Sequence, residues 1–174
     1  MADIRLMIVS LLPRLRGFAL ALSRSSDAAD DLVQATCEKA LRASDSWTPG
    51  TRLDSWMFRI MQNHWIDERR KHRPHQSVDE DEHRNIAGDD GGRITEARLT
   101  LNTVRELVEA MPDDQRSVVI LVCVEELSYR EAADVLEVPI GTVMSRLSRA
   151  RRALIEAMEE NEAGRRAGAS GDGS

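Results

Sequence analysis

The feature that most constrains how this chain can fold is a pair of short helical patterns separated by about four residues. In the second pattern, over residues 140–160, apolar side chains recur at intervals of three and four, as they do on one face of an α-helix. That apolar stripe consists of Val143, Leu147, Ala150 and Leu154. Residues 128–154 therefore predict two helices joined by a tight turn, the geometry of a helix-turn-helix.

The first of the two patterns carries its own boundary signals. Ser128 and Glu131 have the S-x-x-E spacing of a capping box, in which each side chain bonds the backbone of the other residue. Ala132 and Ala133 are small enough to let the second helix approach closely. Pro139 suits the first turn of that helix, where a proline sacrifices no hydrogen bond.

The face opposite the apolar stripe is chemically suited to DNA. It carries two hydroxyls and two guanidiniums, from Ser145, Ser148, Arg149 and Arg152. A guanidinium fork matches guanine O6 and N7 or a phosphate, and a serine hydroxyl can bond to either. We expect this helix to read the major groove of duplex DNA. A structural helical hairpin with a solvated basic face is the alternative.

The rest of the chain is also helical in pattern, without strand-like alternation of useful length. Aromatic residues make up only 3% of the chain, which argues against a single large core and for small helical units. The fold is therefore expected to be all-α. Periodicity and capping signals, with Asp27 as one N-cap, predict helices at residues 3–23, 27–43, 53–71, 95–110, 113–124, 128–136 and 140–160.

A break in composition divides the chain. Residues 74–94 hold Pro74, three glycines and an acidic run at 79–82, which predicts a flexible acidic linker. A long surface loop inside one domain is the alternative, although such a loop would be unusual in a compact domain. We expect two small helical domains, at residues 1–73 and 95–162, and a disordered tail at 163–174.

The net charge of −6 is unevenly distributed. Residues 1–75 carry +3, residues 76–100 carry −4 and residues 101–174 carry −5. Even so, Arg146, Arg149, Arg151 and Arg152 lie within seven residues. Salt screens exposed charges beyond roughly 8–10 Å, so this local cluster matters more for DNA than the overall acidity. The acidity argues against a protein that coats DNA and permits a small, focused site.

The sequence holds no constellation that predicts catalysis. Walker A, H-E-x-x-H and G-x-S-x-G motifs are absent, so we expect no enzyme activity, no cofactor and no metal. No apolar run approaches the roughly 20 residues of a membrane span, so we expect no membrane insertion. Cys37 and Cys123 are expected to be buried thiols in a reducing compartment rather than a disulfide.

The stretch LSYREAADVLEVPIGTVMSRLSRARRALIEAM, at residues 127–158, resembles region 4 of the sigma-70 family, and most closely its small extracytoplasmic-function (ECF) group. The match is carried by the run G-T-V-x-S-R-x-x-R-A-R at residues 141–151. The resemblance implies that this region reads the upstream −35 promoter element. The residues we assign to that DNA are Tyr129, Arg130, Thr142, Ser145, Arg146, Ser148, Arg149 and Arg152.

Two residues depart from the family pattern. Glu137 stands at the turn where relatives usually have glycine, so either the turn avoids positive φ or the chain accepts a small strain cost. Met144 replaces a common basic residue beside the reading face. One phosphate contact is then missing, which predicts weaker and less salt-dependent binding.

A second stretch, at residues 27–73, resembles sigma region 2 through the segments DAADDLVQAT and WMFRIMQN. The family uses the loop at residues 44–52 to hold a base flipped out of the −10 element, an event that costs a few kcal/mol. A polar strip on the helix expected at residues 53–71 is suited to following the backbone of the separated DNA strand. A solvated polar face on a core helix is the alternative. The residues we assign to −10 DNA are Trp47, Arg59, Asn63 and Arg70.

The helix at residues 27–43 has a polar outer side. In the family this helix docks on the clamp helices of the largest polymerase subunit, and an acidic patch facing a basic surface would give steering and register. A solvated acidic face is the alternative. The residues assigned to polymerase binding are Asp30, Asp31, Gln34 and Glu38.

The two resemblances together imply a cytoplasmic sigma factor that binds core RNA polymerase, directs it to promoter DNA and helps to melt the −10 element. By resemblance alone we also expect an anti-sigma factor as a partner. Two other functions remain open at this point: a stand-alone helix-turn-helix transcriptional regulator, and an adaptor that mimics a sigma factor and sequesters its inhibitor.

Overall fold

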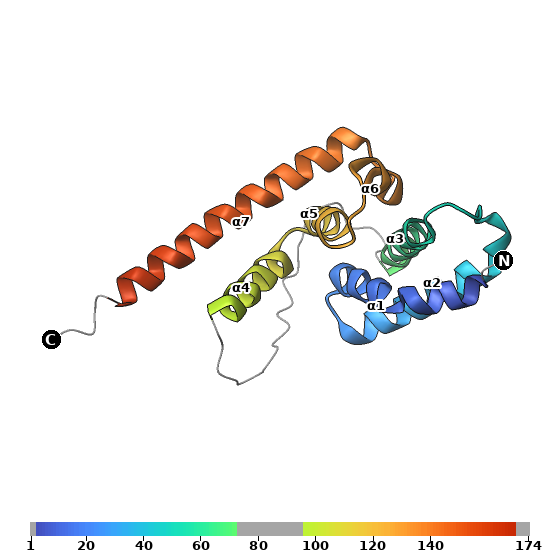
Figure 1. Ribbon diagram of the computed structural model, residues 1–174, viewed down its shortest axis with the longest axis horizontal. Helices are drawn as coiled ribbons and strands as arrows, with labels where there is room; N and C mark the ends of the chain where they lie inside the picture. The colour runs from blue at the N-terminus through green and yellow to red at the C-terminus, as the bar shows by residue number, and fades with distance from the viewer. Residues whose placement is uncertain (1–2, 73–95, 170–174) are drawn as a thin grey trace.

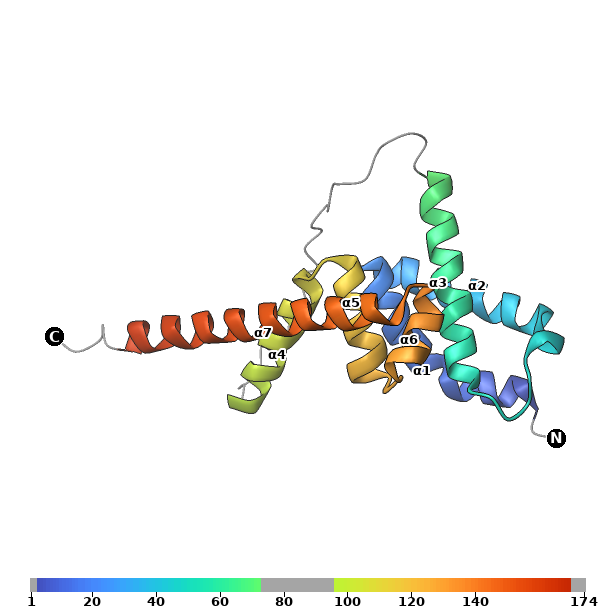
Figure 2. The same cartoon turned by 90° about the horizontal axis from the view of Figure 1, so that it is seen from above.

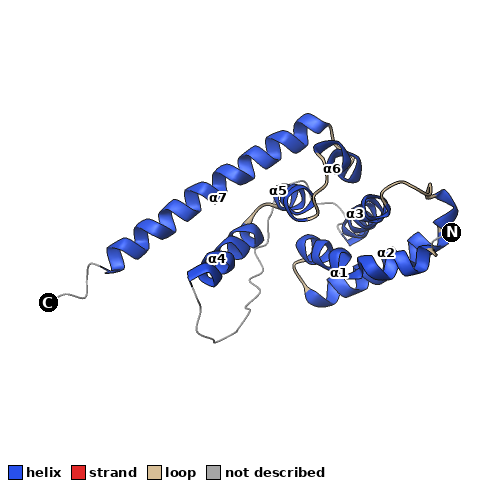
Figure 3. Ribbon diagram, viewed as in Figure 1, coloured by secondary structure: helices blue, strands red, loops and turns tan. Residues whose placement is uncertain are grey.

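The computed structural model describes residues 3–72 and 96–169. Within these two ranges the chain is helical and contains no strand, as Figure 3 shows. The expected all-α fold is confirmed. The expected linker at 74–94 lies outside the described residues.

The N-terminal half is a group of three helices, α1 (Ile4–Ser23), α2 (Ser26–Arg42) and α3 (Leu53–His72), with a 3-10 turn η1 (Ser44–Ser46) after α2. Figure 1 shows α1, α2 and α3 gathered together at one end of the molecule. The prediction that Asp27 caps α2 is wrong. Ser25 is the N-cap, since its side chain accepts a hydrogen bond from the backbone of Ala28, and Asp27 lies in the first turn.

The C-terminal half comprises α4 (Glu96–Ala110), α5 (Asp113–Val119), a π-helical turn η2 (Ile120–Val124), α6 (Tyr129–Leu136) and α7 (Ile140–Ala169). The capping box predicted for α6 is present, with Ser128 and Glu131 each bonded to the backbone of the other.

Two predicted helix ends in this half are wrong. The helix expected at 113–124 is α-helical only to Val119, because its last residues widen into the π turn η2. The helix expected to end at residue 160 continues to Ala169, so the tail expected from residue 163 is helical over most of its length. Ala, Glu and Arg dominate residues 156–168, and these residues favour helix.

The buried side chains of both halves form one continuous cluster, contrary to the expectation that a single core is unlikely. In the N-terminal half, Phe18 of α1 packs edge-on against Phe58 of α3, with ring centroids 5.2 Å apart, and both are fully buried. In the C-terminal half, α5 and α6 pack against α7. Few aromatics are needed because Leu, Val, Ala and Met fill the space between helices.

The two halves meet where α6 lies on α3, as Figure 2 shows, and where α5 and η2 lie on α1. The second contact centres on Arg116, which is 2% exposed although its guanidinium is charged. It donates to the backbone carbonyls of Ala21 in α1 and Met111, and it pairs with Asp113.

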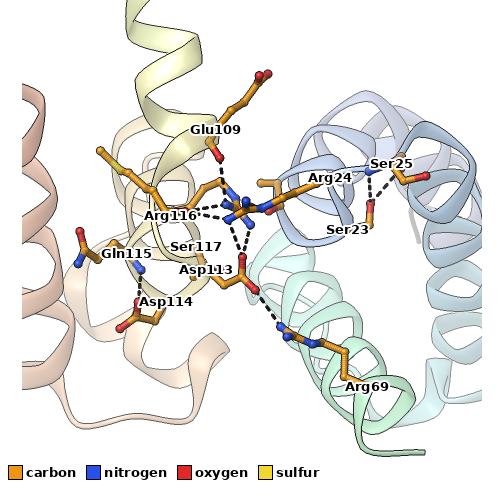
Figure 4. A network of polar contacts seen from close by, with 12 residues as sticks. Ser23, Arg24, Ser25, Arg69, Glu109, Asp113, Asp114, Gln115, Arg116 and Ser117 are labelled. Atoms are coloured by element: carbon orange, nitrogen blue, oxygen red, sulfur yellow. Dashed lines mark hydrogen bonds and ion pairs between the residues drawn. The ribbon is translucent and has the colours of Figure 1, made fainter. Parts of the chain in front are cut away.

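Asp113 is the common acceptor of this contact. Figure 4 shows three guanidiniums converging on its carboxylate, from Arg24 just after α1 at 3.0 Å, Arg69 of α3 at 2.8 Å, and Arg116 of α5. Burial would raise the pKa of Asp113, but the hydrogen bond and charge of Arg116, together with Arg24 and Arg69, lower that pKa below its ordinary value. The ionised carboxylate therefore helps to hold α1, α3 and α5 together.

Helix α1 is long and apolar enough, by length and composition alone, to cross a membrane. Core helices of soluble proteins pass the same test. Leu15, Phe18 and Ala19 are fully buried against the other helices, while Arg14 and Arg16 make ion pairs. These contacts pack one side of α1 into the bundle, while Leu6, Val9 and Leu12 are exposed.

The Asp54 carboxylate gives a test of this packing. It accepts hydrogen bonds from Arg52 at 2.7 and 3.1 Å and from the backbone of Ser55 at 2.8 Å, and it pairs with Arg14 of α1 at 2.9 Å. Burial would raise its pKa, but the bonds from Arg52, Ser55 and Arg14 lower the pKa of Asp54 from 3.8 to about 2.

A group whose pKa is lowered by folding stabilises the protein above its unfolded pKa and loses that effect as pH falls through the folded value. We therefore expect Asp54→Asn to reduce the free energy of unfolding at pH 7, measured with urea, and the difference from wild type to shrink between pH 4 and pH 2. The control is Asp31→Asn, at an exposed carboxylate with no ion pair among the described residues. A difference that is the same at pH 7 and pH 2 would contradict this role.

Candidate nucleic-acid interface

The first turns of α7 are held by the predicted apolar stripe. Val143, Leu147 and Ala150 are at most 2% exposed, and Leu154 is half-buried. The supporting helix α6 buries Ala132, Ala133, Val135 and Leu136 in the same way. The helical spacing therefore correctly predicted which side of each helix faces the core.

The side of α7 away from this core is open. The Ser145, Ser148, Arg149 and Arg152 side chains are all exposed, as the helical spacing predicted. The Ser145 hydroxyl donates to the carbonyl of Thr142 at 3.1 Å, so its lone pairs remain available to accept. The arrangement presents two hydroxyls and two guanidiniums to one side of a rigid helix, where they can meet base edges or phosphates.

Arg146 lies apart from that open face. Its Nε is 3.2 Å from Oδ2 of Asp114 in α5, and its side chain is only 24% exposed. This ion pair ties the recognition helix to α5. Sequence position alone did not indicate this, because the partner lies 32 residues earlier in the chain.

The other residues assigned to −35 DNA lie at the ends of α6 and α7. Tyr129 packs partly against the core, Arg130 is exposed, and Thr142 is half-buried in the first turn of α7. The helix-turn-helix thus brings Arg130 to its surface, whereas Tyr129 also has a packing role.

The turn between α6 and α7 takes the strained form of the two that the sequence allowed. Glu137 adopts left-handed backbone angles, with φ 54° and ψ 43°, and its N–H donates to the carbonyl of Ala133. Glycine enters this conformation without steric cost, whereas glutamate does not. Met144 is 52% exposed, so its side chain is open to solvent beside the reading face.

The polar strip predicted on α3 is present but largely engaged. Nε and Nη2 of Arg59 lie 3.3 and 3.2 Å from one carboxylate oxygen of Glu137, and Nδ2 of Asn63 lies 3.3 Å from the same oxygen. Arg70 is exposed. Sequence reasoning singled out Glu137, Arg59 and Asn63 separately and missed that they meet.

A second contact of the same kind was missed altogether. Nη1 of Arg52, just before α3, lies 3.3 Å from both carboxylate oxygens of Glu131 in α6. The backbone hydrogen bond from Ser128 and the charge of Arg52 lower the pKa of Glu131, so this carboxylate stays ionised. The opposite net charges of the two halves were the available signal for such contacts.

The loop that precedes α3 places Trp47 half-buried against the core. Its indole Nε1 is buried without a hydrogen-bond partner among the described residues. Of the other aromatics, Phe58 is fully buried, and Trp65 packs partly against the core with Arg69 6.0 Å from its ring centroid. Phe58 therefore has a structural role.

On α2 the four residues assigned to polymerase binding, Asp30, Asp31, Gln34 and Glu38, are all exposed. Asp30 pairs with Arg16 at 2.8 Å, and Glu38 accepts from the Gln34 amide at 3.2 Å. The outer side of α2 is therefore an acidic, solvent-facing surface.

The two cysteines are free, as predicted. Cys37 is half-buried on α2, and burial raises the pKa of its thiol. The prediction that both thiols are buried is wrong for Cys123, which is exposed. The π turn η2 carries Cys123 and exposes it together with Val124.

Comparison with known families agrees with this geometry. The profile of sigma-70 region 2 matches residues 7–75, and that of sigma-70 region 4 matches residues 101–154. An ECF RNA polymerase sigma factor, EcfG of Rhodopseudomonas palustris strain TIE-1, is 36% identical over 84% of this chain and 80% of its own length. The chain belongs to the ECF group of the sigma-70 family.

Other relatives support this assignment. The ECF sigma factor SigW of Bacillus subtilis strain 168 is 31% identical over 72% of this chain and 73% of its own. The solved structure of the sigma factor RpoE of Bartonella quintana, in complex with the anti-sigma factor NepR, superposes with a TM-score of 0.71. That match has 32% sequence identity and covers 91% of this chain and 98% of the other. The helices α1–α3 and α4–α7 are thus sigma regions 2 and 4.

The exposed Met144 yields a prediction about region 4. Replacing it with arginine should restore a phosphate contact, tighten binding to duplex DNA and steepen the salt dependence of log K by about one counterion. Fluorescence anisotropy with a labelled duplex at several salt concentrations measures this.

The control for that experiment is Ile155→Arg, which adds the same charge at another exposed apolar position of α7. The slope should change for Met144→Arg and stay near the wild-type value for Ile155→Arg. Equal slopes in the two variants would mean that position 144 does not face the DNA backbone.

Proposed function

We propose that this ECF sigma factor binds core RNA polymerase and directs it to promoters by reading duplex DNA at −35 with region 4 and melted DNA at −10 with region 2. The observation that carries the proposal is the open face of α7, where Ser145, Ser148, Arg149 and Arg152 are exposed opposite a buried stripe. A rigid helix that presents guanidinium forks and small hydroxyls fits the major groove.

Region 2 acts on the separated strand. Arg59, Asn63 and Arg70 lie on one side of α3, where they can follow a phosphate backbone. The loop that holds Trp47 receives a flipped base of the −10 element, and its contacts offset the cost of unstacking. Binding energy is thereby converted into strand opening without any bond chemistry, so the protein is not an enzyme.

Polymerase binding falls to the acidic outer side of α2. Asp30, Asp31, Gln34 and Glu38 are exposed there and face away from the core. An acidic surface of this kind attracts a basic partner surface and fixes the orientation in which the two proteins dock. These activities place the protein in the cytoplasm, where polymerase and promoter DNA are.

Control by an anti-sigma factor is part of the proposal. The RpoE structure that this chain resembles was solved in complex with the anti-sigma factor NepR. We infer that a comparable partner holds this sigma factor inactive by covering its polymerase-binding surfaces. The inhibitor and polymerase would then compete for the same states of the protein.

The test is transcription in vitro with purified core polymerase on candidate −35/−10 promoters. Wild type should initiate at defined start sites, and Arg149→Ala should lose roughly 1–3 kcal/mol of −35 binding and a matching share of initiation. The control is Arg151→Ala, which removes an exposed arginine on another side of α7.

Two outcomes would overturn the proposal. Tight DNA binding without specific initiation on any promoter would indicate a stand-alone transcriptional regulator. Activity in cells that survives both Arg149→Ala and Ser145→Ala would indicate an adaptor that works by sequestering an inhibitor.

A further inference from the structure

Contacts between the two regions pair cations of region 2 with carboxylates of region 4. This direction is the same in five ion pairs to four carboxylates, and it agrees with the net charges of the two halves. The charged pairs are Arg14–Glu125 at 2.6 Å, Arg24–Asp113 at 3.0 Å, Arg52–Glu131 at 3.3 Å, Arg59–Glu137 at 3.2 Å and Arg69–Asp113 at 2.8 Å.

One of these pairs uses the DNA-binding strip itself. A single oxygen of Glu137 is hydrogen-bonded by Nε and Nη2 of Arg59 and by Nδ2 of Asn63. Those donors are the ones assigned to the −10 strand. Because a donor directed at a carboxylate cannot also be directed at a phosphate, the strip and the strand compete for the same nitrogen atoms.

The backbone of the turn sets this geometry. Glu137 lies at the C-terminal end of α6 in a left-handed conformation, which glycine would adopt at lower cost. Glycine there would close the turn but would supply no carboxylate to α3. Packing of α6 along α3 brings the turn beside Arg59, with Glu131 and Arg52 fixing the other end of α6.

We propose that Glu137 is an intramolecular latch that occupies the single-strand-binding strip of region 2 until region 4 moves away. The inference rests on the proposed function, because it assigns the strip to the −10 strand. It makes region 4 a competitor for that strand in the closed form and a reader of duplex DNA in the open form.

The ion pair between Glu137 and Arg59 is exposed to solvent and can therefore break readily. The side chains of Arg59 and Glu137 are 54% and 51% exposed, and an ion pair of this kind shifts an equilibrium by a factor of about 1.5 to 5. Several such pairs along the contact multiply the effect, yet each is weakened by salt. Docking of the two regions on polymerase or on promoter DNA can therefore outcompete them.

The experiment uses the full chain without polymerase and a fluorescein-labelled 15-nucleotide single-stranded DNA. Glu137→Gln should bind this DNA about 2- to 5-fold more tightly than wild type, and the gain should shrink as salt is raised. The control is Glu126→Gln, which makes the same charge change at another exposed, positive-φ glutamate of region 4 with no ion pair among the described residues. Its affinity should stay near wild type.

A charge exchange separates the latch from a general charge effect. Glu137→Arg should open the protein, seen as a larger radius of gyration in X-ray scattering, and should tighten DNA binding. Combining it with Arg59→Glu should restore the compact radius and abolish the gain in DNA binding, because the strip then carries a negative charge. Equal affinities for wild type and Glu137→Gln, or a radius unchanged by Glu137→Arg, would overturn the latch.

These outcomes are independent of the test of promoter function. The latch is measured in the free protein, whereas the proposed function is measured as initiation with core polymerase. Normal initiation, together with equal DNA affinities for wild type and Glu137→Gln, would contradict the latch and leave the proposed function intact. Tighter DNA binding by Glu137→Gln in a protein that never supports initiation would contradict the proposed sigma activity and leave the latch intact.

Discussion

The buried guanidinium of Arg116 is the interaction on which the arrangement of the two regions depends. A charge in this position is costly unless its donors are satisfied. Arg116 meets that requirement with carbonyls of Ala21 and Met111 and the carboxylate of Asp113, so it bonds both regions at once. Arg24 and Arg69 then complete the coordination of Asp113 from the region 2 side.

In the latch that we propose, the same side chains have different roles in the two states of the protein. In the closed form, Arg59 and Asn63 bind Glu137, while the open face of α7 stays exposed. Region 4 is therefore ready to meet duplex DNA before region 2 is free to hold a separated strand.

Periodic patterns predicted the helices well because the spacing of apolar residues determines which face of a helix is buried. The stripe of Val143, Leu147 and Ala150, the capping box of Ser128, and the outward Ser145 and Arg149 are all in the positions expected from a regular helix. Features that depend on a choice between alternative local hydrogen bonds were not predicted. The π turn after Val119 and the Ser25 cap depend on hydrogen bonds that periodicity does not encode.

Contacts between distant segments were the least predictable part of the site. Nothing near Arg146 in the sequence indicates Asp114, and nothing near Arg59 indicates Glu137. These pairs follow from the packing of α7 on α5 and of α6 on α3, which the sequence patterns of single helices do not specify. The departure of Glu137 from glycine was visible in advance, but its role required the fold.

We infer that the two regions are joined in the free protein and separate on polymerase. The most direct measurement is energy transfer between fluorophores at residues 10 and 126, one in each region, with Cys37 and Cys123 replaced by serine. We predict efficient transfer in the free protein and a marked fall when core RNA polymerase is added. Transfer that is already low in the free protein, or that core polymerase leaves unchanged, would contradict the claim.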